Sequence, residues 1–243
     1  MSTDPVMTPP DADNLARVLE RRRADRTDVV GLYGEDGRSW TFDEIDLLAG
    51  GVAVALRAEG VSAGDRVACY LTNGPDIVFF LFGCWKLGAV PVTVSSLYNA
   101  AELAESLAKT SPRLLLVDGR SPDVVAELAS ARAGVAIRRV AQLRPATGGV
   151  GEADVEPLPW RRQVRVPAVD VDPQAEACVL FTGGTTGRPK AVSVTHGGTR
   201  DSLMRLACVA TGTDAEGTAS AAARRTAGSG AISVSEPRAE RIT

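Results

Sequence analysis

The chain has 243 residues, enough for one large domain or two small ones, of which 44% are hydrophobic and 23% charged. These proportions are typical of a soluble globular protein. The formal net charge of −3 gives no reason to expect nucleic acid or an anionic membrane as a partner. The most apolar stretch, residues 77–94, is interrupted by Lys86, Gly88 and Pro91, so no membrane-spanning helix is expected there.

The sequence contains four widely separated cysteines: Cys69, Cys84, Cys178 and Cys208. They show no spacing typical of a metal site, so buried, reduced thiols are expected. No local feature supports a catalytic pair between a cysteine and the single histidine, His196. Residues 1–13 contain Pro and Asp and lack the apolar core of a signal peptide, so a cytoplasmic location is expected.

The N-terminal region is predicted to contain a hairpin followed by a helix. Residues 28–33 and 39–41 are typical of two short strands joined by a turn. Thr41 and Glu44 have the spacing of a capping box, which predicts a helix starting after Thr41. Gly60 is placed to end that helix.

From residue 65 onward, predicted strands and helices alternate. Strands are expected at residues 65–71, 89–94, 113–117 and 137–140, and helices between them at residues 75–87, 100–109 and 121–132. Further helices are expected outside this stretch, at residues 14–26 and 199–210. Such alternation implies right-handed crossovers and a parallel sheet covered on both faces. The predicted fold class is therefore α/β, a doubly wound and mostly parallel sheet with helices on both faces.

Two segments break this pattern. Residues 142–172 are rich in proline and glycine and are predicted to form a surface linker, on which residues 161–165 form a solvated cationic patch. Residues 211–243 contain mostly Ala, Gly, Ser, Thr and Arg. They bury too little apolar area to offset their ordering entropy, so a disordered tail is expected.

Residues 182–190 (TGGTTGRPK) form a loop between two predicted strands, residues 177–181 and 191–195. Glycines let successive backbone N–H groups converge on an anion. Threonine hydroxyls donate hydrogen bonds to phosphate oxygens, while Arg188 and Lys190 add positive charge. On composition alone, the loop is either a phosphate-binding loop or a flexible, solvated one. A nucleotide-binding P-loop is excluded, because a strand rather than a helix follows the lysine.

The loop and its surroundings resemble the adenylate-forming superfamily of AMP-forming acyl-CoA synthetases and AMP-dependent ligases. Residues 180–196 (LFTGGTTGRPKAVSVTH) are similar to the phosphate loop of that family. Gly183 replaces the common Ser there and Ala191 the common Gly. Upstream, the similar segments are residues 37–44 (GRSWTFDE), 60–67 (GVSAGDRV) and 85–92 (WKLGAVPV). The resemblance covers residues 14–205.

The resemblance implies an ATP-dependent ligase that uses ATP with Mg. A carboxylic acid, such as a fatty acid, attacks the α-phosphorus, pyrophosphate leaves, and the acyl adenylate passes its acyl group to CoA or a carrier thiol. The resemblance assigns no protein nucleophile and no protein metal ligand. It assigns contact with the triphosphate to seven residues: Thr182, Gly183, Gly184, Thr185, Thr186, Gly187 and Lys190.

Two motifs of that family, Tyr-Gly-x-Thr-Glu and Thr-Gly-Asp, do not occur in the 243 residues. Residues 14–210 are therefore expected to form an incomplete N-terminal adenylation domain, and residues 211–243 a low-complexity tail. Three interpretations stay open: a truncated and inactive ligase, one half of a split enzyme completed by a second chain, or a non-enzymatic module that binds phosphate or nucleotide.

Overall fold

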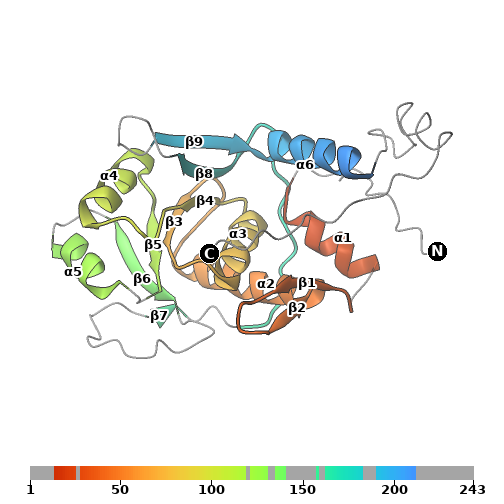
Figure 1. Ribbon diagram of the computed structural model, residues 1–243, viewed down its shortest axis with the longest axis horizontal. Helices are drawn as coiled ribbons and strands as arrows, with labels where there is room; N and C mark the ends of the chain where they lie inside the picture. The colour runs from red at the N-terminus through yellow and green to blue at the C-terminus, as the bar shows by residue number, and fades with distance from the viewer. Residues whose placement is uncertain are drawn as a thin grey trace, which may run out of the picture. The chain divides into compact units, whose positions relative to one another are not determined.

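A computed structural model describes residues 14–25, 28–118, 121–130, 135–140, 157–158, 162–182 and 190–211. Residues 10–200 belong to one compact unit, which contains the sheet, and the described residues 201–211 belong to a second unit (Figure 1). Residues 212–243 lie outside the described residues. The predicted domain division and tail therefore stay predictions.

The elements follow the alternation that the sequence predicts. In chain order they are α1 (Arg17–Asp25), β1 (Val30–Tyr33), β2 (Ser39–Thr41), α2 (Phe42–Ala58), β3 (Arg66–Tyr70), α3 (Pro75–Leu87), β4 (Val90–Thr93), α4 (Ala100–Thr110), β5 (Leu114–Val117), α5 (Pro122–Ser130), β6 (Ala136–Val140), β7 (Pro157–Leu158), β8 (Glu176–Thr182), β9 (Lys190–Thr195) and α6 (His196–Thr211).

Seven strands form the central sheet in the order β7-β6-β5-β3-β4-β8-β9. Every neighbouring pair in it is parallel except β8 and β9, which are antiparallel. Strands β1 and β2 form the separate antiparallel hairpin that the sequence predicts. Because the parallel strands are joined through helices, the chain crosses over the sheet between successive strands.

The two faces of the sheet carry two separate apolar cores. Alternate side chains of β3 point to opposite faces: Val67 and Cys69 pack in the core that includes α2 and α3, whereas Ala68 and Tyr70 pack in the core that includes α4 and α5. Figure 1 shows these helix pairs on opposite sides of the strands. All four residues of β5 are buried, as expected for a strand covered on both faces. The predicted doubly wound α/β fold is confirmed.

Helix α2 begins and ends at the residues that the sequence indicates. The Thr41 side chain accepts a hydrogen bond from the Glu44 N–H, and the Glu44 carboxylate accepts one from the Thr41 N–H, which completes the capping box. At the other end, Gly60 has a φ of +77°. The N–H of Val61 donates to the Leu56 carbonyl, which is the Schellman arrangement that a glycine favours.

Residues 162–172 contain no helix or strand and are mostly exposed, as predicted for a surface linker, but two of them are buried. This segment crosses α2 and α3, and the side chains of Val166 and Ala168 are buried. The Val164 N–H donates to the carbonyl of Leu47 in α2 (3.2 Å). A Cβ atom on Gly50 would lie 1.7 Å from the Val164 carbonyl oxygen, so only glycine allows the segment to pass this close to the helix.

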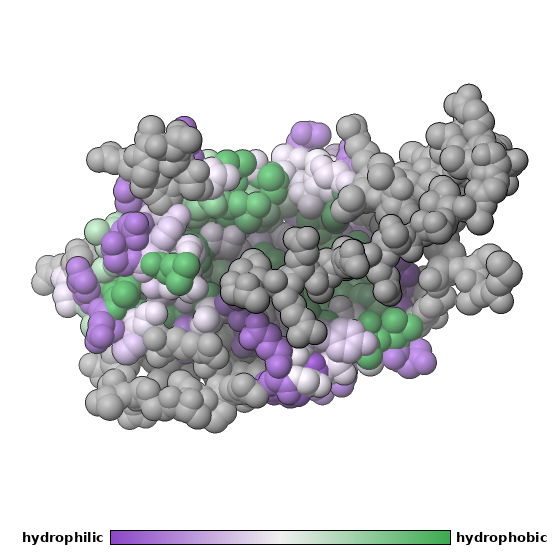
Figure 2. Space-filling model, in the orientation of Figure 1, coloured by the Kyte–Doolittle hydropathy of each residue, from purple (hydrophilic) through white to green (hydrophobic). Residues whose placement is uncertain are grey.

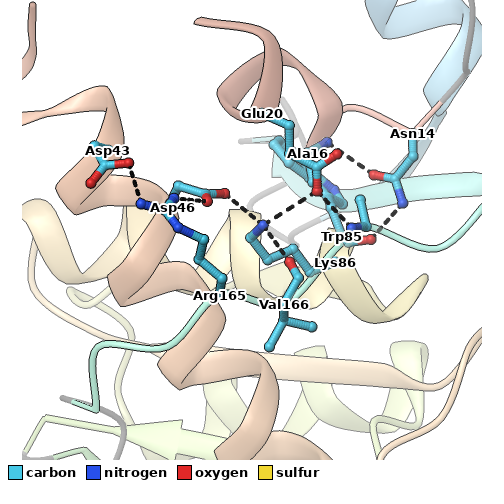
Figure 3. Close-up of polar contacts among 10 residues, drawn as sticks. Asn14, Ala16, Glu20, Asp43, Asp46, Trp85, Lys86, Arg165 and Val166 are labelled. Atoms are coloured by element: carbon cyan, nitrogen blue, oxygen red, sulfur yellow. Dashed lines mark hydrogen bonds and ion pairs between the residues drawn. The ribbon is translucent and has the colours of Figure 1, made fainter. Parts of the chain in front are cut away.

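A buried lysine holds this segment in place (Figure 3). The Lys86 side chain is 0% exposed, and its Nζ donates to Asp46 Oδ1 (2.6 Å) and to the Val166 carbonyl (2.7 Å). The Glu20 carboxylate lies 3.6 Å from the same Nζ and accepts the Ala168 N–H (2.7 Å). Helices α1, α2 and α3 therefore meet residues 162–172 at one charged cluster.

Arg165 is exposed, as predicted for a solvated cationic patch, but it also forms ion pairs. Its guanidinium lies 2.6 Å from Asp43 Oδ1 and 3.2 Å from Asp46 Oδ2. These hydrogen bonds, chiefly the one that Arg165 donates to Asp43, raise the pKa of Arg165. Arg165 thus shares Asp46 with Lys86 and connects the exposed side of the segment to the buried pair.

Candidate phosphate-binding site

The candidate site lies at the tip of the β8–β9 hairpin. Thr182 is the last residue of β8 and Lys190 the first of β9, and the two are partners in the antiparallel register. Both side chains are exposed. The predicted arrangement of a loop between two strands is confirmed, and it brings a hydroxyl and an ammonium group to the same end of the hairpin.

The other five predicted contacts fall on residues that the structure does not describe: Gly183, Gly184, Thr185, Thr186 and Gly187. Their assignment to the triphosphate therefore stays a prediction. Residues Thr182 and Lys190, which flank them, carry the structural account of the site.

The hairpin tip lies at the carboxyl edge of the parallel strands. Strands β3, β4, β5 and β8 run in the same direction, so their carboxyl ends share this edge with Thr182. Asp118, which follows β5, accepts hydrogen bonds from the N–H and hydroxyl of Thr72, which follows β3. Ligands of open α/β sheets bind outside the carboxyl ends of the strands, so the edge is the expected place for a phosphate site.

One face of β8 is packed and the other is open. Ala177 and Val179 are buried beneath the sheet's neighbouring elements. On the opposite face, Leu180 and Val192 are cross-strand partners that remain 42% and 41% exposed. Figure 2 shows hydrophobic side chains gathered over β8 and β9. Exposed apolar pairs of this kind mark surfaces that pack against further protein or aggregate.

An ion pair fixes the base of the hairpin to the sheet. Glu176 at the start of β8 accepts two hydrogen bonds from the Arg66 guanidinium at the start of β3 (2.8 and 2.9 Å). Burial raises the pKa of Glu176, but the hydrogen bonds from Arg66 and Ser193 and the charge of Arg66 outweigh it, so the pKa lies below its usual value. The same hydrogen bond raises the pKa of Arg66.

Two further side chains anchor the hairpin, and both were missed as functional candidates from the sequence. Trp85 Nε1 donates to the carbonyl of Ala177 in β8 (2.7 Å). His196, directly after β9, is buried and accepts the N–H of Leu15 through Nδ1 (3.2 Å). Two signals were available in the sequence. His196 is a polar ring that immediately follows a strand, and Trp85 is an aromatic residue next to a lysine in an apolar helix.

The cysteines take no part in the described site. Burial raises the pKa of Cys69 to about 12 and raises the pKa of Cys84 well above its usual value. Burial also raises the pKa of Cys178. These thiols are therefore protonated at neutral pH, which makes them poor nucleophiles. Cysteines 69, 84 and 178 are free, as expected.

A family model described as AMP-binding enzyme matches residues 14–222. The chain belongs to the AMP-binding enzyme family. The chain is 31% identical over 206 residues to 4-coumarate–CoA ligase 5 of Oryza sativa subsp. japonica, a match that covers 83% of the chain and 36% of the relative. It is 31% identical over 176 residues to a feruloyl-CoA synthase of an Amycolatopsis species, which covers 72% of the chain and 32% of the relative.

The fold agrees with that of solved family members. The crystal structure of the anthranilate CoA ligase AuaEII in complex with anthranoyl-AMP superposes with a TM-score of 0.65 at 24% identity, covering 77% of this chain and 36% of that one. The chain thus spans about a third of the length of the relatives it matches. The resemblance to the adenylate-forming superfamily is confirmed.

The described part of the chain lacks two kinds of feature. It contains no helix that is long and apolar enough to cross a membrane. Within the same residues, no group of three or more His, Cys, Asp or Glu side chains is arranged to hold a metal ion.

Proposed function

We propose that this chain holds the triphosphate of ATP for an AMP-forming ligase that activates a carboxylic acid. The observation that carries the proposal is the pairing of Thr182 with Lys190 at the carboxyl edge of the sheet, in a chain of the AMP-binding family. A hydroxyl donor and an exposed ammonium group suit phosphate oxygens. The residues proposed to contact the triphosphate are Thr182, Gly183, Gly184, Thr185, Thr186, Gly187 and Lys190.

The proposed reaction has two steps. A carboxylate oxygen forms a bond to the α-phosphorus while the bond from that phosphorus to the bridging oxygen breaks, and pyrophosphate leaves with the oxygen. A thiol sulfur then attacks the acyl carbon of the acyl adenylate and AMP leaves. Holding and neutralising the β- and γ-phosphates favours the first step, because negative charge builds up on the departing pyrophosphate. Lys190 is the described residue of this chain that supplies that charge.

Magnesium enters this proposal with the nucleotide. Mg²⁺ prefers oxygen ligands and is commonly held by substrate phosphates together with few protein groups. The described donors at the hairpin tip, those of Thr182 and Lys190, are a hydroxyl and an ammonium group, which suit the phosphates rather than the ion. We therefore propose that MgATP, rather than a resident protein-bound ion, is the species that binds.

Coenzyme A is the proposed thiol acceptor, since the relatives include a feruloyl-CoA synthase and a 4-coumarate–CoA ligase. A carrier protein is the alternative, because another relative is a fatty acid–[acyl-carrier-protein] ligase of Streptomyces coeruleorubidus, 30% identical over 161 residues. The acid is proposed only as a carboxylic acid, aryl or fatty. The predicted cytoplasmic location stays a prediction.

We propose that turnover also requires protein segments corresponding to the rest of the relatives. The chain spans about a third of their length, and neither Tyr-Gly-x-Thr-Glu nor Thr-Gly-Asp occurs in its 243 residues. The exposed Leu180–Val192 pair favours a second polypeptide, or further sequence, packing beside the hairpin. Nucleotide binding and turnover are therefore tested separately.

The binding test is isothermal titration of the 243-residue chain with MgATP and with pyrophosphate. Lys190→Ala should weaken binding of both ligands about tenfold to a hundredfold, the worth of a charge-assisted hydrogen bond of about 1.5–3 kcal/mol. Arg57→Ala is the charge-matched control, since Arg57 is exposed near the end of α2, before β3. Equal losses from both variants, or no binding by the unmodified chain, would refute the proposed phosphate site.

The turnover test is acid-dependent exchange between ATP and pyrophosphate. Ferulate, 4-coumarate and a fatty acid should each give no exchange with the 243-residue chain alone. Exchange should appear with one of them when the product of an adjacent reading frame supplies the remaining segments. Robust exchange by the chain alone would overturn the need for further segments and leave the ligase proposal standing.

A further inference from the structure

The base of the β8–β9 hairpin is closed by main-chain hydrogen bonds to the residues that precede β8. The N–H of His196 donates to the Ala175 carbonyl (3.1 Å), and the N–H of Gly197 donates to the Pro173 carbonyl (2.8 Å). His196 therefore stands where β9 ends. Its side chain is only 1% exposed, although histidine is a polar residue.

The His196 ring connects this base to two other parts of the fold. Its Nδ1 accepts the N–H of Leu15, which lies 181 residues earlier in the chain (3.2 Å). The ring also meets the Trp85 ring edge to face, with a centroid distance of 6.4 Å. Trp85 in turn donates to β8 at Ala177 (2.7 Å), and its carbonyl accepts the Asn14 side-chain amide (2.7 Å; Figure 3).

Strand β9 depends on this base more than β8 does. Strand β8 pairs with β4 as far as Leu180, two residues before Thr182. Strand β9 is the last strand of the described sheet and pairs there with β8. Its six residues span about 20 Å at roughly 3.4 Å per residue. A tilt of about 3° at His196 would therefore displace Lys190 by about 1 Å, and a displacement of that size can cost about a hundredfold in function.

We propose that His196 is a positioning residue that sets the place of Lys190 by fixing the end of β9 through the Leu15–Nδ1 hydrogen bond. This inference rests on the proposed phosphate site. The ring is the neutral tautomer protonated at Nε2, because a nitrogen that accepts a hydrogen bond carries no proton. Positioning of Lys190 therefore requires a hydrogen-bond acceptor for the Leu15 N–H at this position, and it does not require an aromatic ring.

Two substitutions separate the acceptor from the ring. His196→Asn keeps an oxygen acceptor close to the position of Nδ1, whereas His196→Phe keeps an aromatic ring against Trp85 and loses the acceptor. We expect His196→Asn to bind MgATP within about threefold of the unmodified chain and His196→Phe to bind about tenfold more weakly. Leu128→Ala in α5, in the core on the other face of the sheet, is the control for general destabilisation and should leave the affinity unchanged.

A double-mutant cycle tests whether the effect acts through Lys190. If His196 positions Lys190, the chain with both His196→Phe and Lys190→Ala should bind MgATP no more weakly than Lys190→Ala alone. Losses that add would overturn the inference, as would equal affinities for His196→Phe and the unmodified chain. Thermal unfolding curves are measured for every variant, and the titrations are then carried out at a temperature at which all of the variants are folded.

The amide NMR signal of Lys190 gives a readout that does not depend on nucleotide. His196→Phe should shift the signals of residues 190–195, and His196→Asn should leave them close to their original positions. As the only histidine in the sequence, His196 also gives a single imidazole signal that reports the Nε2-protonated tautomer. If the unmodified chain fails to bind MgATP, the proposed function is refuted, and unchanged Lys190 signals in His196→Phe then refute the positioning role independently.

Discussion

Substituting Lys86 tests the charged cluster that joins three helices to residues 162–172. The Lys86–Asp46 pair is buried, with side-chain exposures of 0% and 4%, and the Nζ–Oδ1 distance is 2.6 Å. Removing one partner of a buried pair costs about 3–5 kcal/mol, because it leaves the other charge uncompensated. In Lys86→Met, Asp46 would keep the Arg165 guanidinium at 3.2 Å as a partner for its charge. This compensation is partial, because the Arg165 side chain is 45% exposed. The expected loss is therefore near the lower end, about 3 kcal/mol.

The assay is urea unfolding followed by tryptophan fluorescence at pH 7. A loss of about 3 kcal/mol is a large part of the 5–15 kcal/mol stability of a typical domain, and it would lower the melting temperature by roughly 6–12 °C for a unit of this size. The matched control is Lys109→Met. Lys109 pairs with Glu105 one helical turn away on the surface of α4 (2.9 Å), a type of pair worth about 0.5 kcal/mol or less.

A double variant separates the charge from the packing. Lys86→Met combined with Asp46→Leu removes both charges, and replacing a buried ion pair by apolar side chains is often neutral. The double variant should therefore be more stable than Lys86→Met alone. The reasoning is refuted if Lys86→Met lowers the free energy of unfolding by less than about 1 kcal/mol. It is also refuted if adding Asp46→Leu lowers that free energy by about 3 kcal/mol more.

The remaining predictions concern the hairpin. Because the folded-state pKa of Glu176 is lowered, its ion pair with Arg66 stabilises the fold above the unfolded pKa and loses that contribution as the pH falls through the folded pKa. Unfolding free energy should therefore decline less steeply from pH 7 to pH 3 in Glu176→Gln than in the unmodified chain, and identical pH profiles would contradict this. Replacing the exposed pair with Leu180→Lys and Val192→Thr should lower binding of an apolar fluorescent dye and lessen aggregation, with stability changed by about 0.5 kcal/mol or less. Unchanged dye fluorescence would show that the hydrophobic surface lies elsewhere.

Much of the sheet could be predicted because its signals are local. The capping box of Thr41 and Glu44 and the stop at Gly60 gave the bounds of α2 to within two residues. The run of four apolar residues in β5 gave a strand buried on both faces. Thr182 and Lys190 were predicted as the two ends of the loop between strands. The structure includes each of them in its strand, and the register pairs them.

The start of α6 shows how a local signal was missed. The helix begins at His196 rather than Thr199, although Gly197 and Gly198 disfavour a helix. The Thr195 hydroxyl accepts the Gly198 N–H (3.1 Å), which is an N-cap with the spacing that Thr41 shows in α2. The glycines hid the cap, because the helix was predicted to begin only after them, at Thr199.

The course of residues 162–172 could not be predicted from the sequence. Its proline and charged residues are typical of a surface linker, and the residues that hold it against the helices lie far away in the chain. Gly50 allows its close approach to α2. The Lys86 ammonium group donates hydrogen bonds both to the Val166 carbonyl of the segment and to the Asp46 carboxylate. A lysine in an apolar helix is visible in the sequence. Its partners are set by tertiary packing, which no local pattern contains.

These long-range contacts imply that the proposed phosphate site is a property of the whole unit rather than of the hairpin. The hairpin base is held by Leu15 through His196, across 181 residues, and by Arg66 through Glu176, across 110. Closing loops of this length costs entropy before the contacts stabilise the fold. An isolated peptide of residues 176–195 would lack both anchors, and two-stranded hairpins are marginally stable at best alone. Thr182 and Lys190 are therefore expected to lie next to each other as cross-strand partners only when residues 14–200 are folded together.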